Sequence, residues 1–186
     1  MFALVKLNET GVDRDGKPTQ YDTISLFQPY TLWQDKSGIQ HAPDELFKLS
    51  TTQKQDLGIY DVAYGTHLDE QFYTVTQNAP TFDKTAKIVR VTYTSTAKPL
   101  ADVGDIKGLK SNWISNFNQN VNALLSQTDW MLVRKIERNV AVPSAVATQR
   151  AAIITENNRL ATAITAASTV EALITAVKSA NFPTGA

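Results

Sequence analysis

Residues Gly11 to Lys17 have the composition that comes nearest to a binding motif in this sequence. Two glycines five residues apart and a following lysine are typical of phosphate-binding loops. However, Pro18 stands where such a loop needs a hydroxyl for magnesium, and Asp13 and Asp15 would face the phosphates. A strand is also predicted to follow, where that motif needs a helix. A nucleotide hydrolase is therefore a remote alternative, and we interpret the segment as a hairpin loop with an Asp-Gly turn.

The residue types that usually carry catalysis or bind metals are few and scattered. His41 and His67 stand alone in predicted loops, with no second histidine one helical turn away. The chain has no cysteine, and no Gly-x-Ser-x-Gly segment occurs in it. We therefore expect no catalytic residue, no cofactor and no metal site, and we expect both histidines to lie on the surface. The sequence favours a protein that is not an enzyme.

The composition is typical of a folded protein with balanced charge. The chain has 186 residues, of which 42% are hydrophobic, with 18 Lys and Arg against 18 Asp and Glu. This length is sufficient to bury a core. A net charge of zero argues against a dedicated nucleic-acid binder, which needs a basic excess. Because the first residues turn polar at Asn8 and no apolar run could cross a bilayer, we expect a soluble protein made in the cytoplasm.

The first half of the sequence has the alternation of β-strands. In Lys87–Thr94, successive side chains alternate between two faces, with β-branched and aromatic residues throughout. Pro43–Leu57 breaks the pattern and is predicted to form one or two short helical turns. These features predict an antiparallel β-sandwich-like domain over residues 1–100. The other predicted strands, separated by glycine and proline turns, are Phe2–Leu7, Thr23–Phe27, Tyr30–Gln34, Ile59–Tyr64 and Gln71–Thr76.

The second half has the helical period, and the overall prediction is an α+β fold with a helical domain over residues 105–186. A first helix is predicted from Lys107 to Ser126. Thr128 and Asp129 are typical N-cap residues and predict a second, short helix. Trp130 is expected to anchor that helix by packing against Phe117 or Val121 of the first. The domain boundary is predicted between Thr96 and Lys107.

Two further helices are predicted from their ends. Pro143 would open the third, because proline is tolerated at the first helical position. Ser168 and Glu171 have the spacing of a capping box, which predicts a last helix from Val170 to Ala180 that ends before Pro183.

Two segments of the helical half could contact a partner. The basic run Arg134–Arg138 is interpreted as a solvated helix face, with a partner-gripping arginine surface as the alternative. Five residues of the third helix have the spacing of a coiled-coil seam between chains, but ordinary packing inside the domain is the favoured interpretation. In a seam, the two polar members would fix the register between copies. The five residues are Arg150, Ile153, Asn157, Leu160 and Ile164.

The helical half resembles the C-terminal domain of bacteriophage tail fibre assembly proteins. The likeness covers residues 123–180 and rests on the Thr-Asp-Trp element at 128–130, Arg134 four residues after the tryptophan, Pro143 ahead of a helix, and Arg150 within it. In that family an aromatic residue often precedes the last arginine, where this chain has Gln149. The N-terminal half is also similar to phage tail accessory proteins, through the motif Leu57–Val62.

The resemblance implies a chaperone that binds and protects the distal part of a trimeric tail fibre, in the host cytoplasm during phage assembly. Unfinished fibre tips expose unpaired strand edges that aggregate. It implies the fibre protein as partner, for which we expect a 3:3 complex, and a homotrimer is an alternative state. A permanent component of the tail or baseplate is the alternative function. Neither a nucleic acid nor a membrane is expected as a partner.

The residues expected to contact the partner come from both halves. They are aromatic side chains in the β half and mostly polar side chains in the helical half, and Thr128, Asp129, Trp130 and Pro143 are expected to be structural. The expected contacts are Tyr64, Phe72, Tyr73, Tyr93, Arg134, Arg150, Ile153 and Asn157.

Overall fold

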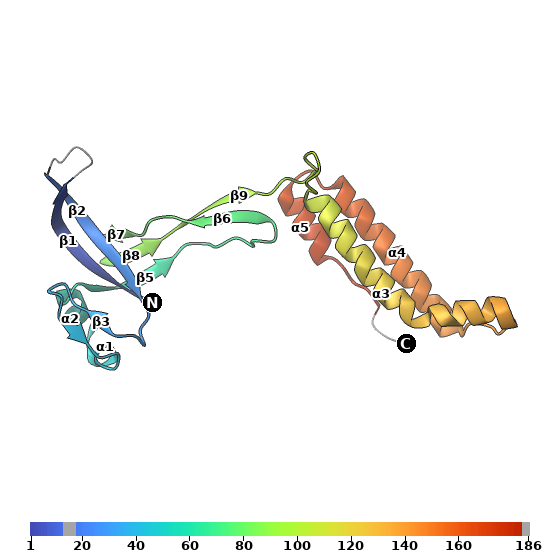
Figure 1. Ribbon diagram of the computed structural model, residues 1–186, viewed down its shortest axis with the longest axis horizontal. Helices are drawn as coiled ribbons and strands as arrows, with labels where there is room; N and C mark the ends of the chain where they lie inside the picture. The colour runs from blue at the N-terminus through green and yellow to red at the C-terminus, as the bar shows by residue number, and fades with distance from the viewer. Residues whose placement is uncertain (13–17, 184–186) are drawn as a thin grey trace. The chain divides into compact units, whose positions relative to one another are not determined.

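The computed structural model describes residues 1–12 and 18–183, with the side chains of all of these except 8–12 and 18–21. Strands fill the first half and helices the second, so the predicted α+β class is confirmed (Figure 1). The chain divides into two compact units. The first contains Met1–Leu68 and Val75–Ser95, and the second contains Asp69–Thr74 and the chain from Thr96 onward. The domain boundary between Thr96 and Lys107 stays a prediction.

The first unit is built on a five-stranded sheet with the order β2-β1-β5-β8-β7. Strands β1 (Phe2–Val12) and β2 (Pro18–Phe27) form a long antiparallel hairpin, whose register shifts between Lys6 and Glu9. Strand β5 (Ile59–Tyr64) pairs antiparallel with β1. It pairs in parallel with β8 (Ile88–Val91), because residues 65–87 bring the chain back to the same end of the sheet. Strand β7 (Thr81–Asp83) closes the far edge.

The alternation along β1 separates two clusters of buried side chains. Ala3 and Val5 point to one face, where they join a cluster that also holds partly buried residues of β2. Phe2 and Leu4 point to the other face, which a small lobe of the same unit covers. Each face of the sheet therefore has its own hydrophobic core. The first core consists of the buried residues Ala3, Val5 and Val89, and the second consists of Trp33, Leu46 and Ile59.

The small lobe holds two short strands and two short helices. The strands are β3 (Trp33–Gln34) and β4 (Gln40–His41), which pair antiparallel. The helices are α1 (Glu45–Lys48) and α2 (Thr51–Asp56), so the helical turns predicted within Pro43–Leu57 are confirmed. Helix α2 begins at a capping box, in which Ser50 Oγ accepts from Gln53 N at 3.2 Å and Gln53 Oε1 accepts from Ser50 N at 2.8 Å.

Gly58 explains why the Leu57–Val62 motif contains a glycine. Its φ is +81°, a region that favours glycine. A Cβ there would lie 3.0 Å from the carbonyl oxygen of Val5 and 3.0 Å from Lys36 Cβ, tighter than ordinary contacts. The Gly58 carbonyl accepts a hydrogen bond from Val5 N at 2.9 Å, which ties the turn to β1. The glycine of this motif therefore has a structural role.

The strand predicted over Lys87–Thr94 is two strands that pair with different partners. Its first part, β8, lies in the five-stranded sheet, and its second part is β9 (Tyr93–Ala97), which pairs with β6 (Tyr73–Gln77). The break falls at Thr92, whose carbonyl accepts from Asn78 N at 2.9 Å, while the Val91 carbonyl accepts from Gly65 N at 2.8 Å. Alternation alone could not reveal this exchange of partners.

The second unit contains three helices: α3 (Leu109–Arg138), α4 (Ser144–Ala166) and α5 (Val170–Lys178). The two helices predicted on either side of Thr128 are one helix of 30 residues, so that prediction was wrong. Thr128 caps nothing, because its hydroxyl donates to the carbonyl of Leu125 one turn earlier, at 3.2 Å. No proline or glycine interrupts α3, so nothing local opposes continuation of the helix.

Trp130 was predicted to anchor one helix to another, but in the structure it does not. Its side chain is 53% exposed. It belongs to the same helix as Phe117 and Val121, and nine residues of helix place Val121 about 13 Å away along the axis. The expected burial of Trp130 was therefore wrong.

The buried residues of the three helices cluster in only one part of the unit. The segment Asp69–Thr74 joins them: Phe72 stacks on Trp113 with ring centroids 5.5 Å apart, and Tyr73 donates a hydrogen bond to Glu171 Oε1 at 2.7 Å. We call this part the helical base. Its buried helix residues are Leu109, Phe117 and Val121 of α3, Ile153, Leu160 and Ile164 of α4, and Val170, Leu173 and Ala176 of α5.

Helix α5 begins one residue later than the predicted capping box requires. Its N-cap is Thr169, whose side chain accepts from Ala172 N at 3.1 Å. The predicted pairing of Ser168 with Glu171 was wrong, because Glu171 accepts the hydroxyl of Tyr73 instead. Across the described residues, none of the helices combines the length and hydropathy that a membrane span needs.

Candidate functional site

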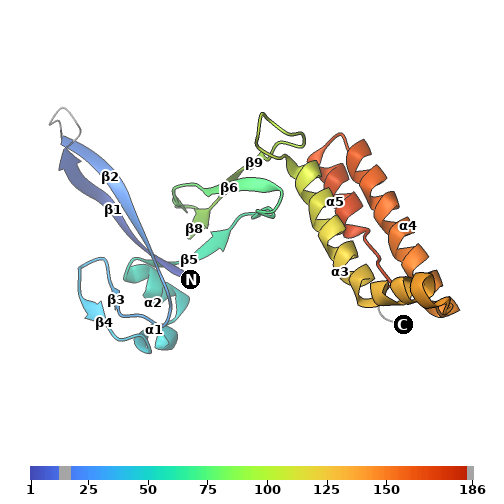
Figure 2. The same ribbon diagram turned by 45° about the vertical axis from the view of Figure 1, so that its right-hand side comes forward.

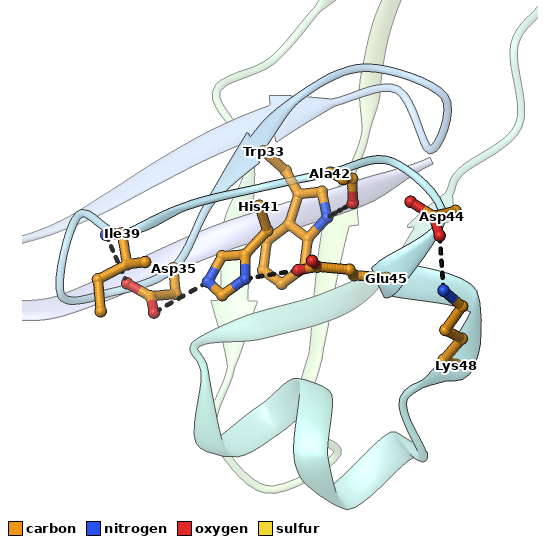
Figure 3. Close-up of polar contacts among 8 residues, drawn as sticks. All are labelled: Trp33, Asp35, Ile39, His41, Ala42, Asp44, Glu45 and Lys48. Atoms are coloured by element: carbon orange, nitrogen blue, oxygen red, sulfur yellow. Dashed lines mark hydrogen bonds and ion pairs between the residues drawn. The ribbon is translucent and has the colours of Figure 1, made fainter.

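His41 lies at the centre of a network of polar contacts in the small lobe (Figure 3). Its Nε2 lies 3.2 Å from Asp35 Oδ2 and its Nδ1 lies 2.9 Å from Glu45 Oε2. Its ring stacks on Trp33, with centroids 4.2 Å apart, and Trp33 Nε1 donates to the carbonyl of Ala42 at 3.0 Å. The prediction that His41 stands alone on the surface was wrong: its side chain is 21% exposed and has two carboxylate partners.

The geometry makes this network a structural clasp. Both ring nitrogens face carboxylate oxygens, and only the imidazolium form has a proton for each. A general base needs a ring nitrogen that is open to a substrate, and His41 has none. The second oxygen of Asp35 accepts the backbone N–H groups of Ser37 and Ile39 at 2.8 and 3.0 Å. Asp35, His41 and Glu45 therefore join β3, β4 and α1.

The pKa directions follow from the same contacts. Burial disfavours the charged form of His41, but its hydrogen bonds with Asp35 and Glu45 outweigh burial and raise the pKa above the ordinary 6.5. Burial likewise opposes ionisation of Asp35, but the hydrogen bonds from His41, Ile39 and Ser37 lower the pKa of this carboxyl below 3.8. The clasp is therefore complete at weakly acidic pH.

We expect the free energy of unfolding of the first unit to decrease as the pH rises above about 6.5. A raised pKa of His41 means that the folded state holds a proton which the unfolded state has lost above pH 6.5. The stabilisation is full below that pH and disappears as the pH passes the folded-state pKa. Urea titrations at several pH values would measure the slope.

The variant His41→Gln should remove most of this slope. His67→Gln is the matched control and should retain it, because His67 lies against the edge of the Tyr93 ring, with centroids 4.8 Å apart, and not in the clasp. Equal slopes in wild type and His41→Gln would contradict the assignment.

No metal site is found among the described residues. In residues 1–12 and 18–183, no group of three or more His, Cys, Asp or Glu side chains is placed to hold a metal ion. The predicted hairpin loop, Gly11–Lys17, and with it the remote nucleotide interpretation, lies largely outside the described residues.

A second candidate site is the outer part of the α3–α4 pair, residues 122–152, which we call the helical arm. The two helices lie side by side and are joined by residues 139–143 (Figures 1 and 2). The arm has no buried residue, because the last on α3 is Val121 and the first on α4 is Ile153. Its large exposed hydrophobic side chains are Trp130, Leu132, Val133, Ile136 and Val140, with Ile136 84% exposed.

Arg150 clamps the two helices of the arm together. Its guanidinium donates to the Leu125 carbonyl at 2.7 Å, to Thr128 Oγ1 at 2.6 Å and to Asp129 Oδ1 at 2.8 Å. The Arg150 side chain is 14% exposed, so this charge is partly desolvated. Thr128 and Asp129, predicted to cap a helix, instead bind an arginine from the neighbouring helix. Thr128, Asp129 and Arg150, three of the residues that carry the family resemblance, are thus joined in one contact.

The predicted seam on the third helix lies within the chain. Ile153 is 2% exposed, Leu160 and Ile164 are fully buried, and Asn157 donates to Asn118 Oδ1 of α3 at 2.9 Å. Together with the Arg150 clamp, these contacts confirm the favoured interpretation, packing inside the domain. Ile153 and Asn157 were predicted to contact a partner, but they pack against the chain's own helices instead.

The four aromatic residues predicted to contact a partner have different environments. Phe72 and Tyr73 are buried in the helical base, so they are core residues and not surface contacts. Tyr64 is 45% exposed, and its hydroxyl donates to the sulfur of Met1. Tyr93 is half-buried against His67. Of the four, Tyr64 has the largest accessible surface.

The exposed side of the arm carries a shallow groove that contains Trp130 and Arg134. The Arg134 guanidinium lies over the Trp130 ring, 4.9 Å from its centroid. Val133, Glu137 and Arg138 complete the groove. Arg134 Nε is buried and has no acceptor among the described residues, which is an energetically unfavourable state. Of the predicted contacts in the helical half, Arg134 is therefore the one best placed to bind a partner.

We expect Arg150→Met to lower the free energy of unfolding of the second unit by about 1 to 3 kcal/mol, because three hydrogen bonds from a charged donor are lost. Amide hydrogen exchange should show the loss as faster exchange in the arm, with little change in α5. Arg138→Met is the matched control, since Arg138 is exposed. Unchanged exchange of the arm in Arg150→Met would contradict the clamp.

Comparisons of this chain with protein-family models, with curated proteins and with solved structures find no match. The geometry of the arm is therefore the firmest basis for a functional proposal.

Proposed function

We propose that this protein is an assembly chaperone of a phage tail fibre, which binds and protects the distal part of the trimeric fibre while that part folds. The observation that carries the proposal is the helical arm. It presents Trp130, Val133 and Ile136 to solvent, with no buried residue of its own. Exposed hydrophobic patches of this kind mark surfaces that bind another protein.

The chemistry of the groove favours a protein partner. Tryptophan and arginine are the residues most often found to dominate binding energy at interfaces, and here they lie together as Trp130 and Arg134. The arm has four basic and two acidic residues, a net charge of +2. A partner segment with carboxylates beside apolar side chains would complement it. The neutral charge of the whole chain disfavours a polyanion as the partner.

The residues that carry the family resemblance support the same surface. Thr128, Asp129 and Arg150 hold the two helices together, while Trp130 stays exposed with the Arg134 guanidinium over its ring. A recurrent motif that fixes an arm and presents a tryptophan on it is consistent with a shared binding role.

Co-expression with a phage tail fibre protein tests the proposal. We expect the wild-type chain to increase the yield of soluble fibre trimer, and Trp130→Ala with Arg134→Ala to abolish the increase. Tyr30→Ala is the matched control, an aromatic residue 79% exposed outside the arm. Soluble trimer formed equally well without the chain would overturn the proposal.

We further propose three copies of this chain on one fibre trimer, because a symmetric target presents each binding surface three times. Native mass measurement of the purified complex would detect a 3:3 assembly. One copy per trimer would contradict it. Purified virions that retain the chain in stoichiometric amount would instead favour the permanent tail component.

A further inference from the structure

Strand β2 is an edge strand of the five-stranded sheet in the first unit. Among the described strands it pairs with β1 alone. Ile24 lies opposite Val5, and the N–H of Val5 donates to Gly58 on the far side of β1, at 2.9 Å. Val5 and Ile24 therefore do not exchange backbone hydrogen bonds, and the N–H and C=O groups of Ile24 point away from β1. Because a strand repeats every two residues, the N–H and C=O groups of Leu26 also point away from β1.

A groove lies beside this edge, on the face of the sheet that carries the small lobe. Ser25 and Phe27 of β2, Leu4 of β1, and Leu32 and Trp33 contribute to its walls, and its volume is about 270 Å³. Leu32 is 64% exposed and Trp33 is 2% exposed, so the groove has an aromatic floor and an open side. It is large enough for an apolar side chain.

These two features together favour an extended segment as the occupant. Outward N–H and C=O groups on every second residue match the repeat of another strand, whereas a helix uses its own backbone groups internally. In an added strand, the residue opposite Ser25 would stand on the same face as Ser25 and so reach the groove. Backbone bonds would then supply affinity, and the groove would select the side chain.

Natural proteins usually protect such an edge with charge, proline or a bulge. On the β1–β2 hairpin, Pro18 and the register shift between Lys6 and Glu9 lie toward the far end, and the nearest charge on β2 is Asp22, which pairs with Lys84 at 3.4 Å. The stretch from Thr23 to Phe27 contains neither a charged residue nor a proline, and its register with β1 is regular.

We infer that β2 binds its partner by strand addition, accepting an extended segment of the unfinished fibre at Ile24 and Leu26 and an apolar side chain of that segment in the groove. The inference rests on the proposed function for the identity of the partner. It adds a second contact surface, in a different unit from the helical arm.

Residue-resolved amide exchange by NMR tests the inference directly. The labelled chain would be compared alone and in complex with the distal fragment of the tail fibre protein. We expect the amides of Ile24 and Leu26 to exchange roughly tenfold or more slowly in the complex. The amide of Ser25, which bonds to β1, should be protected in both states. A complex in which Ile24 and Leu26 exchange as in the free chain overturns the inference but not the proposed function.

Leu32→Glu and Ile39→Glu form a matched pair of variants. Both residues are aliphatic and lie on the surface of the small lobe, with Leu32 64% exposed and Ile39 60% exposed. Only Leu32 lines the groove. We expect fibre affinity to decrease roughly tenfold or more in Leu32→Glu and to stay unchanged in Ile39→Glu. Equal affinities would overturn strand addition. Absence of any binding by the wild-type chain would overturn both proposals. If the Ile24 amide becomes protected from exchange as the chain concentration rises, without fibre present, a second copy of this chain occupies the edge instead.

Discussion

Replacing Trp33 with alanine is expected to lower the free energy of unfolding of the first unit by about 3 to 5 kcal/mol. The Trp33 side chain is 2% exposed and stacks between Phe27 and His41, with centroid distances of 6.4 and 4.2 Å. Its removal would leave a cavity between the lobe and the sheet. It would also leave the Ala42 carbonyl without its indole donor.

Trp130→Ala is the matched control for this variant. Trp130 is 53% exposed, and its ring contact with Arg134 is expected to be worth less than about 1 kcal/mol. Urea unfolding followed by circular dichroism would therefore separate the two tryptophan variants clearly. Equal losses of stability would show that Trp130 is buried in solution, as the sequence alone had suggested.

The second large effect is expected from Leu160→Ala in the helical base, at about 2 to 5 kcal/mol. Leu160 is fully buried in the last third of α4, a helix that packs against both α3 and α5. The loss of three carbons there leaves a cavity that three packed helices cannot readily fill. Thr155→Ala, at an exposed position of the same helix, should change stability by about 0.5 kcal/mol or less.

The two core variants also test whether the units unfold independently. If they do, Leu160→Ala will shift the transition of the helical unit and leave the pH-dependent transition of the first unit in place. Trp33→Ala will do the reverse. A single transition shifted by both variants would show that the two units unfold together.

Local sequence patterns predicted the elements that local forces determine. Ile59–Tyr64 was predicted with its observed bounds, since its alternation is flanked by glycines at 58 and 65. Thr128 and Asp129 misled because their capping chemistry is satisfied by Arg150, more than twenty residues later. Spacing in the sequence does not indicate which helix will lie alongside.

The clasp around His41 was partly visible in the sequence. Glu45 lies four residues after His41, one turn away if the intervening segment is helical, and Asp35 lies six residues before it. What the sequence could not show is that the ring stands on Trp33 and directs one nitrogen at each carboxylate. Similarly, Phe72 and Tyr73 follow a strand-like pattern, yet they are buried against helices that come much later in the chain.

The confinement of buried residues to the helical base makes the length of the arm adjustable. No residue between Val121 and Ile153 belongs to a core. Both helices can therefore be shortened or lengthened by equal numbers of residues, in steps of about two turns or seven residues. Such a change leaves the side chains that pack in the base as they are. Insertions and deletions can therefore change the reach of the tryptophan surface from the base without changing the buried core of the base.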